Sequence, residues 1–156
     1  MIYIYDLDDT VINSRHRTPR AANGALDLNA YRALQTWANI KNDTSLPLAG
    51  VMAANKRRGA YTVILTARRM SRFDYLSLRK LGIRANLILS RDKLFKLFDL
   101  PLAELIYSSN DSEYKAAYLT WLRFKLDVDY SDMVLFDDHK GVLGAAESLG
   151  VNCFDS

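Results

Sequence analysis

Short apolar, β-rich segments alternate with helical segments along this chain. Strands are predicted at residues 2–5, 60–66, 85–90, 132–138 and 151–155, and helices at residues 47–58, 71–82, 112–126 and 140–150. Strands that alternate with helices favour βαβ units, in which the strands run parallel. The order therefore predicts an α/β, Rossmann-like fold in which helices flank a central parallel sheet.

Local signals predict several details of these elements. In the helix at 71–82, the spacing of Phe73, Leu76 and Leu81 predicts that these side chains face inward. Ser112 is a candidate N-cap for the helix at 112–126. Residues 91–111 are ambiguous, since they suit either helices or partly extended structure.

The length of 156 residues fits one domain, and we expect residues 1–156 to form it. The region of roughly 13–45 is polar, with scattered apolar residues at helical spacing. We therefore predict a small cap there, inserted after the first strand and carrying a helix or two.

The composition excludes some classes of protein. No apolar run approaches the roughly eighteen residues that span a bilayer. The start, MIYIYDLDD, turns acidic at once, so we expect no signal peptide, no membrane partner and a cytoplasmic location. The single cysteine, Cys153, cannot form an internal disulfide and gives no sign of a zinc site.

Acidic and hydroxyl side chains follow three of the predicted strands. They are Asp6 and Asp8 after the first strand, Thr66 after the second, and Asp137 and Asp138 at the end of the fourth. The carboxyl ends of parallel strands are where ligands bind in open α/β sheets.

Several carboxylates at one edge need a cation, and oxygen ligands without Cys or clustered His favour Mg²⁺. Two carboxylates two residues apart can also divide the work of nucleophile and general acid–base. The alternative for DLDDT alone is an Asp-rich helix start, which the helix dipole favours.

Four motifs in order resemble those of the haloacid dehalogenase (HAD) superfamily of aspartate-nucleophile phosphotransferases. They are DLDDTVI from Asp6, VILTAR around Thr66, Lys115 within SEYKAAYL, and VLFDD ending at Asp138. The resemblance covers nearly the whole chain and implies a HAD fold with a cap after the first strand.

The resemblance also implies roles for these residues. Asp6 would attack phosphorus and form an aspartyl-phosphate, and Asp8 would act as general acid and then general base. Thr66 would bind the transferring phosphoryl group and Lys115 would neutralise its charge. Mg²⁺ would be held by Asp6, by the backbone carbonyl of Asp8, and by Asp137 or Asp138, with Asp138 preferred.

The layout further resembles phage-type polynucleotide 3′-phosphatases. The shared features are RTP in a small cap, LPLA before a helix, LTARR, and the C-terminal FDDHKGVLGAAESLGVNCF. This resemblance implies nucleic acid 3′-phosphate ends as substrate, in the host cytoplasm if the protein is phage-encoded. The chain lacks a G-x-x-x-x-G-K-(S/T) phosphate loop, so no kinase activity is predicted.

Basic clusters fit a polyanionic substrate, because an arginine fork can bond two phosphate oxygens. We expect substrate to be bound by Thr10, Arg15, Arg17, Ala67 and Arg68. The alternatives are a 5′(3′)-nucleotidase acting on free nucleotides, and a non-catalytic binding protein of the same fold. Tyr31 and Trp37 could either stack on a base or pack within the cap.

Overall fold

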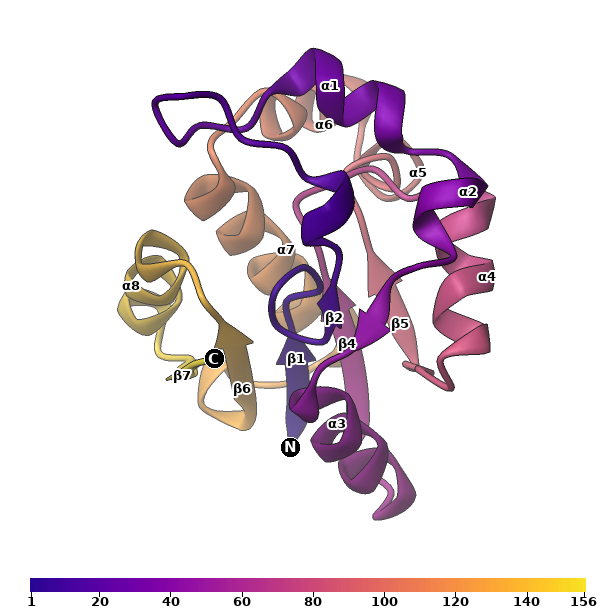
Figure 1. The fold of residues 1–156 in the computed structure, drawn as a ribbon. Helices are drawn as coiled ribbons and strands as arrows, with labels where there is room; N and C mark the ends of the chain where they lie inside the picture. Colours follow the sequence, from indigo (N-terminus) through magenta and orange to yellow (C-terminus); the bar gives the residue numbers. More distant parts are fainter.

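The computed structural model describes residues 1–156 and is built around a five-stranded parallel sheet (Figure 1). The strand order is β5–β4–β1–β6–β7, which places β1 at the centre. The strands are β1 (Ile2–Tyr5), β4 (Tyr61–Leu65), β5 (Leu87–Leu89), β6 (Met133–Asp137) and β7 (Asn152–Asp155). The predicted α/β fold and all five strands are confirmed, with ends that differ by one or two residues.

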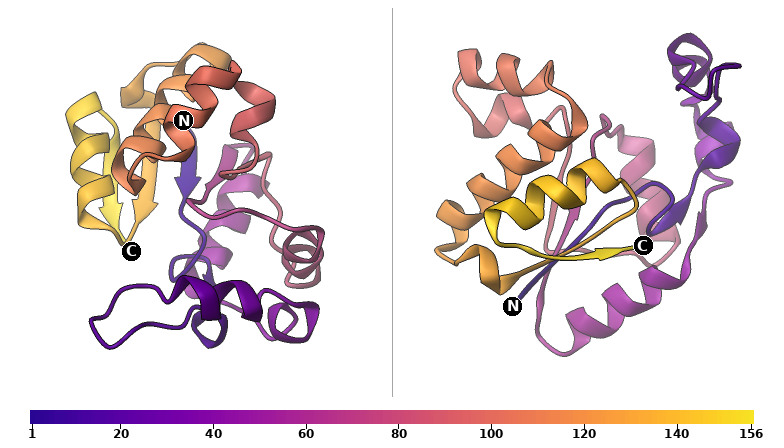
Figure 2. Two further views of the ribbon diagram at one scale, coloured as in Figure 1. Left: turned by 90° about the horizontal axis from the view of Figure 1, so that it is seen from above. Right: turned by 90° about the vertical axis from the view of Figure 1, so that its left-hand side faces the viewer.

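Helices join the strands and cover the sheet on both sides (Figure 2). They are α3 (Pro47–Arg57), α4 (Arg72–Lys80), α5 (Leu94–Leu97), α6 (Leu100–Tyr107), α7 (Asp111–Leu126) and α8 (Lys140–Leu149), with a 3₁₀ turn, η2 (Tyr130–Asp132), before β6. The ambiguous region at 91–111 thus contains two short helices. None of the helices has the length and apolar character needed to cross a membrane.

The core has two parts because successive residues of a strand point to opposite faces of the sheet. Ile4 and Val63 belong to the larger cluster, which includes buried residues of α7 and α8. Their neighbours Tyr5 and Ile64 belong to the smaller cluster, with Met52 of α3 and Leu78 of α4. Burial on both faces explains why the strand segments are almost continuously apolar.

An insertion follows β1 and lies beyond the carboxyl ends of the strands (Figure 1). Its base is a two-stranded antiparallel ribbon of β2 (Ile12–Asn13) and β3 (Thr44–Ser45). Between them lie the 3₁₀ turn η1 (Arg15–Arg17), α1 (Leu28–Leu34) and α2 (Trp37–Ile40). Trp37 packs against Phe73 of α4, with ring centroids 6.0 Å apart. The assignment of 13–45 as a cap within a single domain stays a prediction.

Two local predictions about helices are wrong. Leu76 of α4 is exposed, and the buried residues of that helix are Asp74, Ser77 and Leu78. Phe73 and Leu81 are half-buried as predicted, so the error concerns Leu76, because the helix also presents the polar Asp74 and Ser77 to the insertion. The N-cap of α7 is Asn110, whose side chain accepts from Glu113 N at 2.9 Å, so Ser112 lies inside the first turn.

Leu78→Ala should lower the free energy of unfolding by about 2–5 kcal/mol, because it leaves a cavity in the smaller core. Leu76→Ala, two residues away on the exposed face, should cost less than about 1 kcal/mol. Urea unfolding followed by circular dichroism measures both. Equal losses in the two variants would contradict the orientation of α4.

Burial raises the pKa of the Cys153 thiol to about 11. At pH 8 only ~0.1% of a thiol with this pKa is ionised, and the thiolate is the form that reacts. Iodoacetamide should therefore alkylate Cys153 slowly at pH 8 in the native protein and far faster in urea, as measured by mass spectrometry. Similar rates in both conditions would show that the thiol is not buried in this way.

Candidate active site

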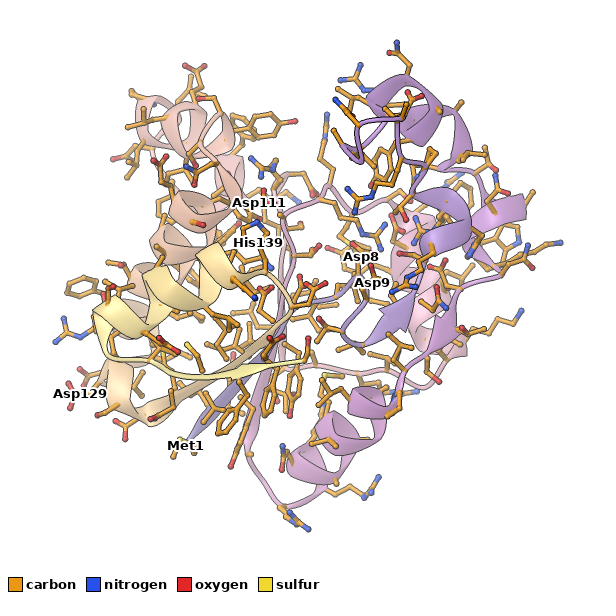
Figure 3. All side chains as sticks on the ribbon, turned by 60° about the vertical axis from the view of Figure 1, so that its left-hand side comes forward. Met1, Asp8, Asp9, Asp111, Asp129 and His139 are labelled. Atoms are coloured by element: carbon orange, nitrogen blue, oxygen red, sulfur yellow. The ribbon has the colours of Figure 1, made fainter.

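The predicted functional residues lie where the strands of the sheet end. Figure 3 shows Asp8, Asp9, Asp111 and His139 at this edge, whereas Met1 and Asp129 lie at the opposite edge. The parallel register explains the arrangement, since Tyr5 pairs with both Ile64 and Phe136 and the three strands therefore end side by side. Residues far apart in sequence are thus brought to one place.

Lys115 of α7 links the carboxyl ends of the adjacent strands β1 and β6. Its Nζ donates to Asp6 Oδ1 and to Asp137 Oδ2, both at 2.7 Å. All three side chains are buried. The structure therefore brings Lys115 to Asp6, as the sequence prediction required, and one cation lies between two carboxylates.

Burial and the mutual charges of the three side chains set the protonation equilibria of this group. Burial raises the pKa of Asp6 to about 7, with Asp137 adding to the rise and Lys115 opposing it. For Lys115, burial alone would lower the pKa, but Asp6 and Asp137 outweigh burial and raise the pKa to about 12. One lysine therefore does not fully compensate two buried carboxylates, and a further cation would be favoured there by charge.

Asp6, Asp137 and Asp138 form the one acidic cluster with metal-binding geometry. Oxygens from the three carboxylates all lie within 4.8 Å of one another. Partial burial of the carboxyl group, followed by the nearby Asp137, raises the pKa of Asp138, although the residue as a whole is exposed. Carboxylate oxygens with no cysteine or histidine among them suit Mg²⁺. Both predicted members of the acidic pair thus lie beside Asp6.

The side chain of Asp8 points away from this cluster. Its Oδ1 accepts from Ser14 Oγ at 2.7 Å, and its Oδ2 lies 3.0 Å from Arg68 Nε. Because its carboxylate is outside the cluster, only the Asp8 backbone could join a metal site there. The separation suits two carboxylates with different tasks.

The next residue, Asp9, adopts a left-handed backbone with φ of 60°. Aspartate tolerates this conformation better than most side chains. The exposed Arg15 binds its carboxylate, with Nε donating to Asp9 Oδ1 at 3.1 Å. Each acidic residue of DLDDT therefore lies against a different basic side chain, which reduces their mutual repulsion.

Two threonine side chains also lie at the carboxyl edge of the sheet. Thr10 Oγ1 donates to Asp6 Oδ2 at 3.3 Å, so this residue contacts the candidate nucleophile. Thr66 is buried directly after β4, and its Oγ1 accepts from Arg68 N at 3.4 Å. The carbonyl of Ala67 accepts from Arg91 Nε at 2.6 Å, which fixes the loop.

Two tyrosines of α7 hold the ends of neighbouring strands. Tyr114 OH donates to the carbonyl of Thr66, and Tyr118 OH donates to the carbonyl of Ser90, both at 2.7 Å. With Lys115, one face of α7 thus contacts the ends of four strands. The sequence prediction placed α7 correctly but did not foresee these contacts, because tyrosines at helical spacing look like ordinary core residues.

Two of the arginines expected to bind substrate are held inside the protein. Arg17 is fully buried and donates to Asp43 through Nε and Nη2, at 2.8 and 2.6 Å. Arg68 donates to Asp74 Oδ1 through Nη1 at 2.9 Å, besides its ion pair with Asp8. Arg17 is therefore wrongly predicted as a substrate ligand, and Arg68 is not a free anion-binding side chain.

Ser14 and Asp74 are the site residues that sequence reasoning missed. Ser14 follows the first motif by a few residues and contacts Asp8 directly. Asp74 forms a capping box with Ser71 at the start of α4. The S-x-x-D pattern signals such a helix start, but its contact with two arginines has no local signature.

Solved structures with the same architecture define the class of fold. A haloacid dehalogenase-like hydrolase from Streptococcus pneumoniae has a TM-score of 0.68 at 13% identity, covering 99% of this chain and 83% of that chain. A HAD-superfamily hydrolase from Geobacter sulfurreducens has a TM-score of 0.67 at 11% identity, covering 99% and 88%. The Pnkp1/Rnl/Hen1 RNA repair complex has a TM-score of 0.56 at 21% identity, covering 99% of this chain and 42% of that chain. The chain thus has the HAD fold.

The family follows from sequence comparison. The family model described as bacteriophage T5 5′-deoxynucleotidase matches residues 1–156, and the chain belongs to this family. The 5′-deoxynucleotidase of Escherichia phage T5 is 40% identical over 164 residues, covering 99% of this chain. The chain spans 66% of that protein's length.

Removing the Asp138 side chain should weaken metal binding without changing the melting temperature of the metal-free protein. Asp138 is exposed and outside the Lys115 ion pairs, so Asp138→Ala should melt like the wild type in a chelator but lose most of the stabilisation by Mg²⁺. Binding of Mg²⁺ at this cluster would stabilise the wild type by about 2.7 kcal/mol at a hundredfold excess over Kd.

Asp137→Ala is the matched comparison. It should destabilise the protein even in chelator, at the lower end of roughly 3–5 kcal/mol, since Lys115 keeps Asp6 as a partner. Thermal melting with and without Mg²⁺ measures both variants. An unchanged Mg²⁺ response in Asp138→Ala would exclude this residue as a ligand.

Proposed function

We propose that the protein is a Mg²⁺-dependent phosphomonoesterase that removes the 5′-phosphate from free deoxynucleotides. The observation that carries the proposal is the match of the whole chain to the deoxynucleotidase family, with 40% identity to a phage relative of that name. The geometry supports it, because the motif residues meet at one edge of the sheet.

In the proposed first step, a carboxylate oxygen of Asp6 bonds to phosphorus and the bond to the 5′-oxygen breaks. Asp8 gives its proton to the leaving oxygen. Water then attacks the aspartyl-phosphate while Asp8 takes a proton from it, which releases phosphate and restores both residues. The placement of Asp8 outside the acidic cluster supports this division of tasks.

Charge stabilisation is the main requirement of phosphoryl transfer. Lys115 is already bound to Asp6, so its ammonium group lies beside the oxygens of a phosphoryl group attached there. Asp6, Asp137 and Asp138 would hold Mg²⁺, which supplies further neutralisation of phosphate charge. The hydroxyl groups of Thr66 and Thr10 lie at the same edge of the sheet, where they would donate hydrogen bonds to phosphate oxygens.

Free nucleotides are favoured over polynucleotide ends, which were the first expectation from the sequence. That expectation drew on a resemblance in layout and on basic clusters near the site, but Arg17 and Arg68 of those clusters are engaged in internal ion pairs. Arg15 is exposed but paired with Asp9. Fewer basic side chains are therefore available for the several phosphates of a polymer.

The substrate test compares a 5′-deoxynucleoside monophosphate with a 3′-phosphorylated oligonucleotide. We expect kcat/KM to be at least about tenfold higher for the mononucleotide, equivalent to about 1.4 kcal/mol of transition-state stabilisation. Phosphate release with Mg²⁺ present measures both. Higher kcat/KM for the oligonucleotide would overturn the proposal in favour of a polynucleotide 3′-phosphatase.

Asp6→Asn is the control for this test, since it keeps the shape of the nucleophile and removes its charge. It should lose activity on both substrates while retaining its circular dichroism spectrum. Activity that persists in this variant would come from a contaminating phosphatase or from a different mechanism.

A further inference from the structure

A buried chain of charged side chains runs from the insertion to Asp8. Arg17 of η1 binds Asp43 and Asp74, Asp74 also binds Arg68, and Arg68 lies against Asp8. The exposed fractions of the side chains are 1% for Arg17, 2% for Asp43, 5% for Asp74 and 11% for Arg68. Signs alternate along the chain, so each buried charge has a partner of opposite charge.

Asp74 is the junction of this chain. Its Oδ1 accepts from Arg17 Nη2 at 3.1 Å and from Arg68 Nη1 at 2.9 Å. Its Oδ2 accepts from Ser71 N at 2.8 Å and from Ser71 Oγ at 3.1 Å. The capping box of α4 therefore fixes the carboxylate, and the carboxylate in turn holds both guanidinium groups.

Two of the three guanidinium nitrogens of Arg68 lie against carboxylates. Its Nη1 is bound to Asp74, and its Nε lies 3.0 Å from Asp8 Oδ2 without forming a well-directed hydrogen bond. Tyr31 of α1 contacts it as well. The carboxylates of Asp8 and Asp74 raise the pKa of Arg68 although burial alone would lower it, so its charge is permanent.

We propose that Asp74 is a positioning residue, whose carboxylate holds Arg68 against Asp8 and ties this contact to Arg17 of the insertion. Asp8 is then fixed from two sides, by Ser14 at Oδ1 and by Arg68 at Oδ2. Loss of Asp74 frees Arg68 to move and leaves Asp8 misplaced for proton transfer. The inference rests on the proposed phosphatase mechanism, in which Asp8 is the general acid.

The test uses leaving groups that differ in their need for a proton. The 5′-oxygen of a deoxynucleotide leaves as a basic alkoxide and needs general acid help, whereas para-nitrophenolate leaves readily without it. Asp74→Asn should lower kcat/KM by about 10- to 100-fold for the deoxynucleotide and by less than about threefold for para-nitrophenyl phosphate. KM should change little for either substrate.

Asp43→Asn is the matched control. Asp43 is equally buried and also binds Arg17, but it does not contact Arg68. Its loss should affect melting temperature while both substrates keep the wild-type ratio of kcat/KM. If Asp74→Asn does not fold, Asp74→Glu replaces it. This variant keeps the negative charge but displaces the carboxylate by one methylene, so the loss of kcat/KM should again be larger for the deoxynucleotide than for para-nitrophenyl phosphate.

Three results would overturn the proposal. Equal losses on both substrates in Asp74→Asn would show a structural role, and a rise in KM alone would show that Arg68 binds substrate. A changed ratio in Asp43→Asn would show that the effect is not specific to Asp74.

The nucleotidase proposal is tested separately by the wild type. If the wild type cleaves aryl phosphates but not deoxynucleotides, that proposal fails. In that case Asp74 is tested with two aryl phosphates. Phenolate is a more basic leaving group than para-nitrophenolate, so Asp74→Asn should lower kcat/KM more for phenyl phosphate.

Discussion

The ion pairs of Lys115 with Asp6 and Asp137 are the interaction on which the candidate site depends. Two buried carboxylates from adjacent strands would repel each other, and breaking a buried ion pair costs about 3–5 kcal/mol because it leaves a charge without a partner. The position of α7 is therefore coupled to β1 and β6 by charge. Tyr114 and Tyr118 of the same helix bind the carbonyls beyond β4 and β5, so one helix aligns the edge at which chemistry is proposed.

The features that sequence predicted well are local or follow from topology. Buried parallel strands are short apolar runs, and they were found within one or two residues. Once the sheet was assumed to be parallel, Asp6, Thr66 and Asp137 had to lie at one edge, since each follows a strand. The family resemblance selected Lys115 from among many lysines, and its burial against Asp6 is what that role requires. The catalytic and metal-binding roles of these residues stay predictions.

The features that sequence missed depend on partners far away in the chain. Arg17 and Asp74 are separated by 57 residues, and nothing in either local segment reveals that they meet. A cluster of basic residues looks the same whether its side chains face solvent or are neutralised inside the protein. Leu76 illustrates the converse, because α4 buries Asp74 and Ser77 against the insertion and leaves this leucine exposed. Polar contacts between elements outweigh hydrophobic spacing there.

The distribution of internal charge bears on which substrates the edge can accept. Asp8 is neutralised by Arg68 and Asp9 by Arg15, so their partners do little to attract a long polyanion. Asp6 and Asp137 instead share one lysine, and Asp138 lies beside them without an ion pair, so an excess of negative charge lies where a metal ion would be bound. The attraction for a metal ion, and through the metal ion for a phosphate group, is thus concentrated at the carboxylate cluster. A phosphomonoester needs only that cluster, which is consistent with the proposed free-nucleotide substrate, whereas the other phosphates of a polymer would find few unpaired basic side chains.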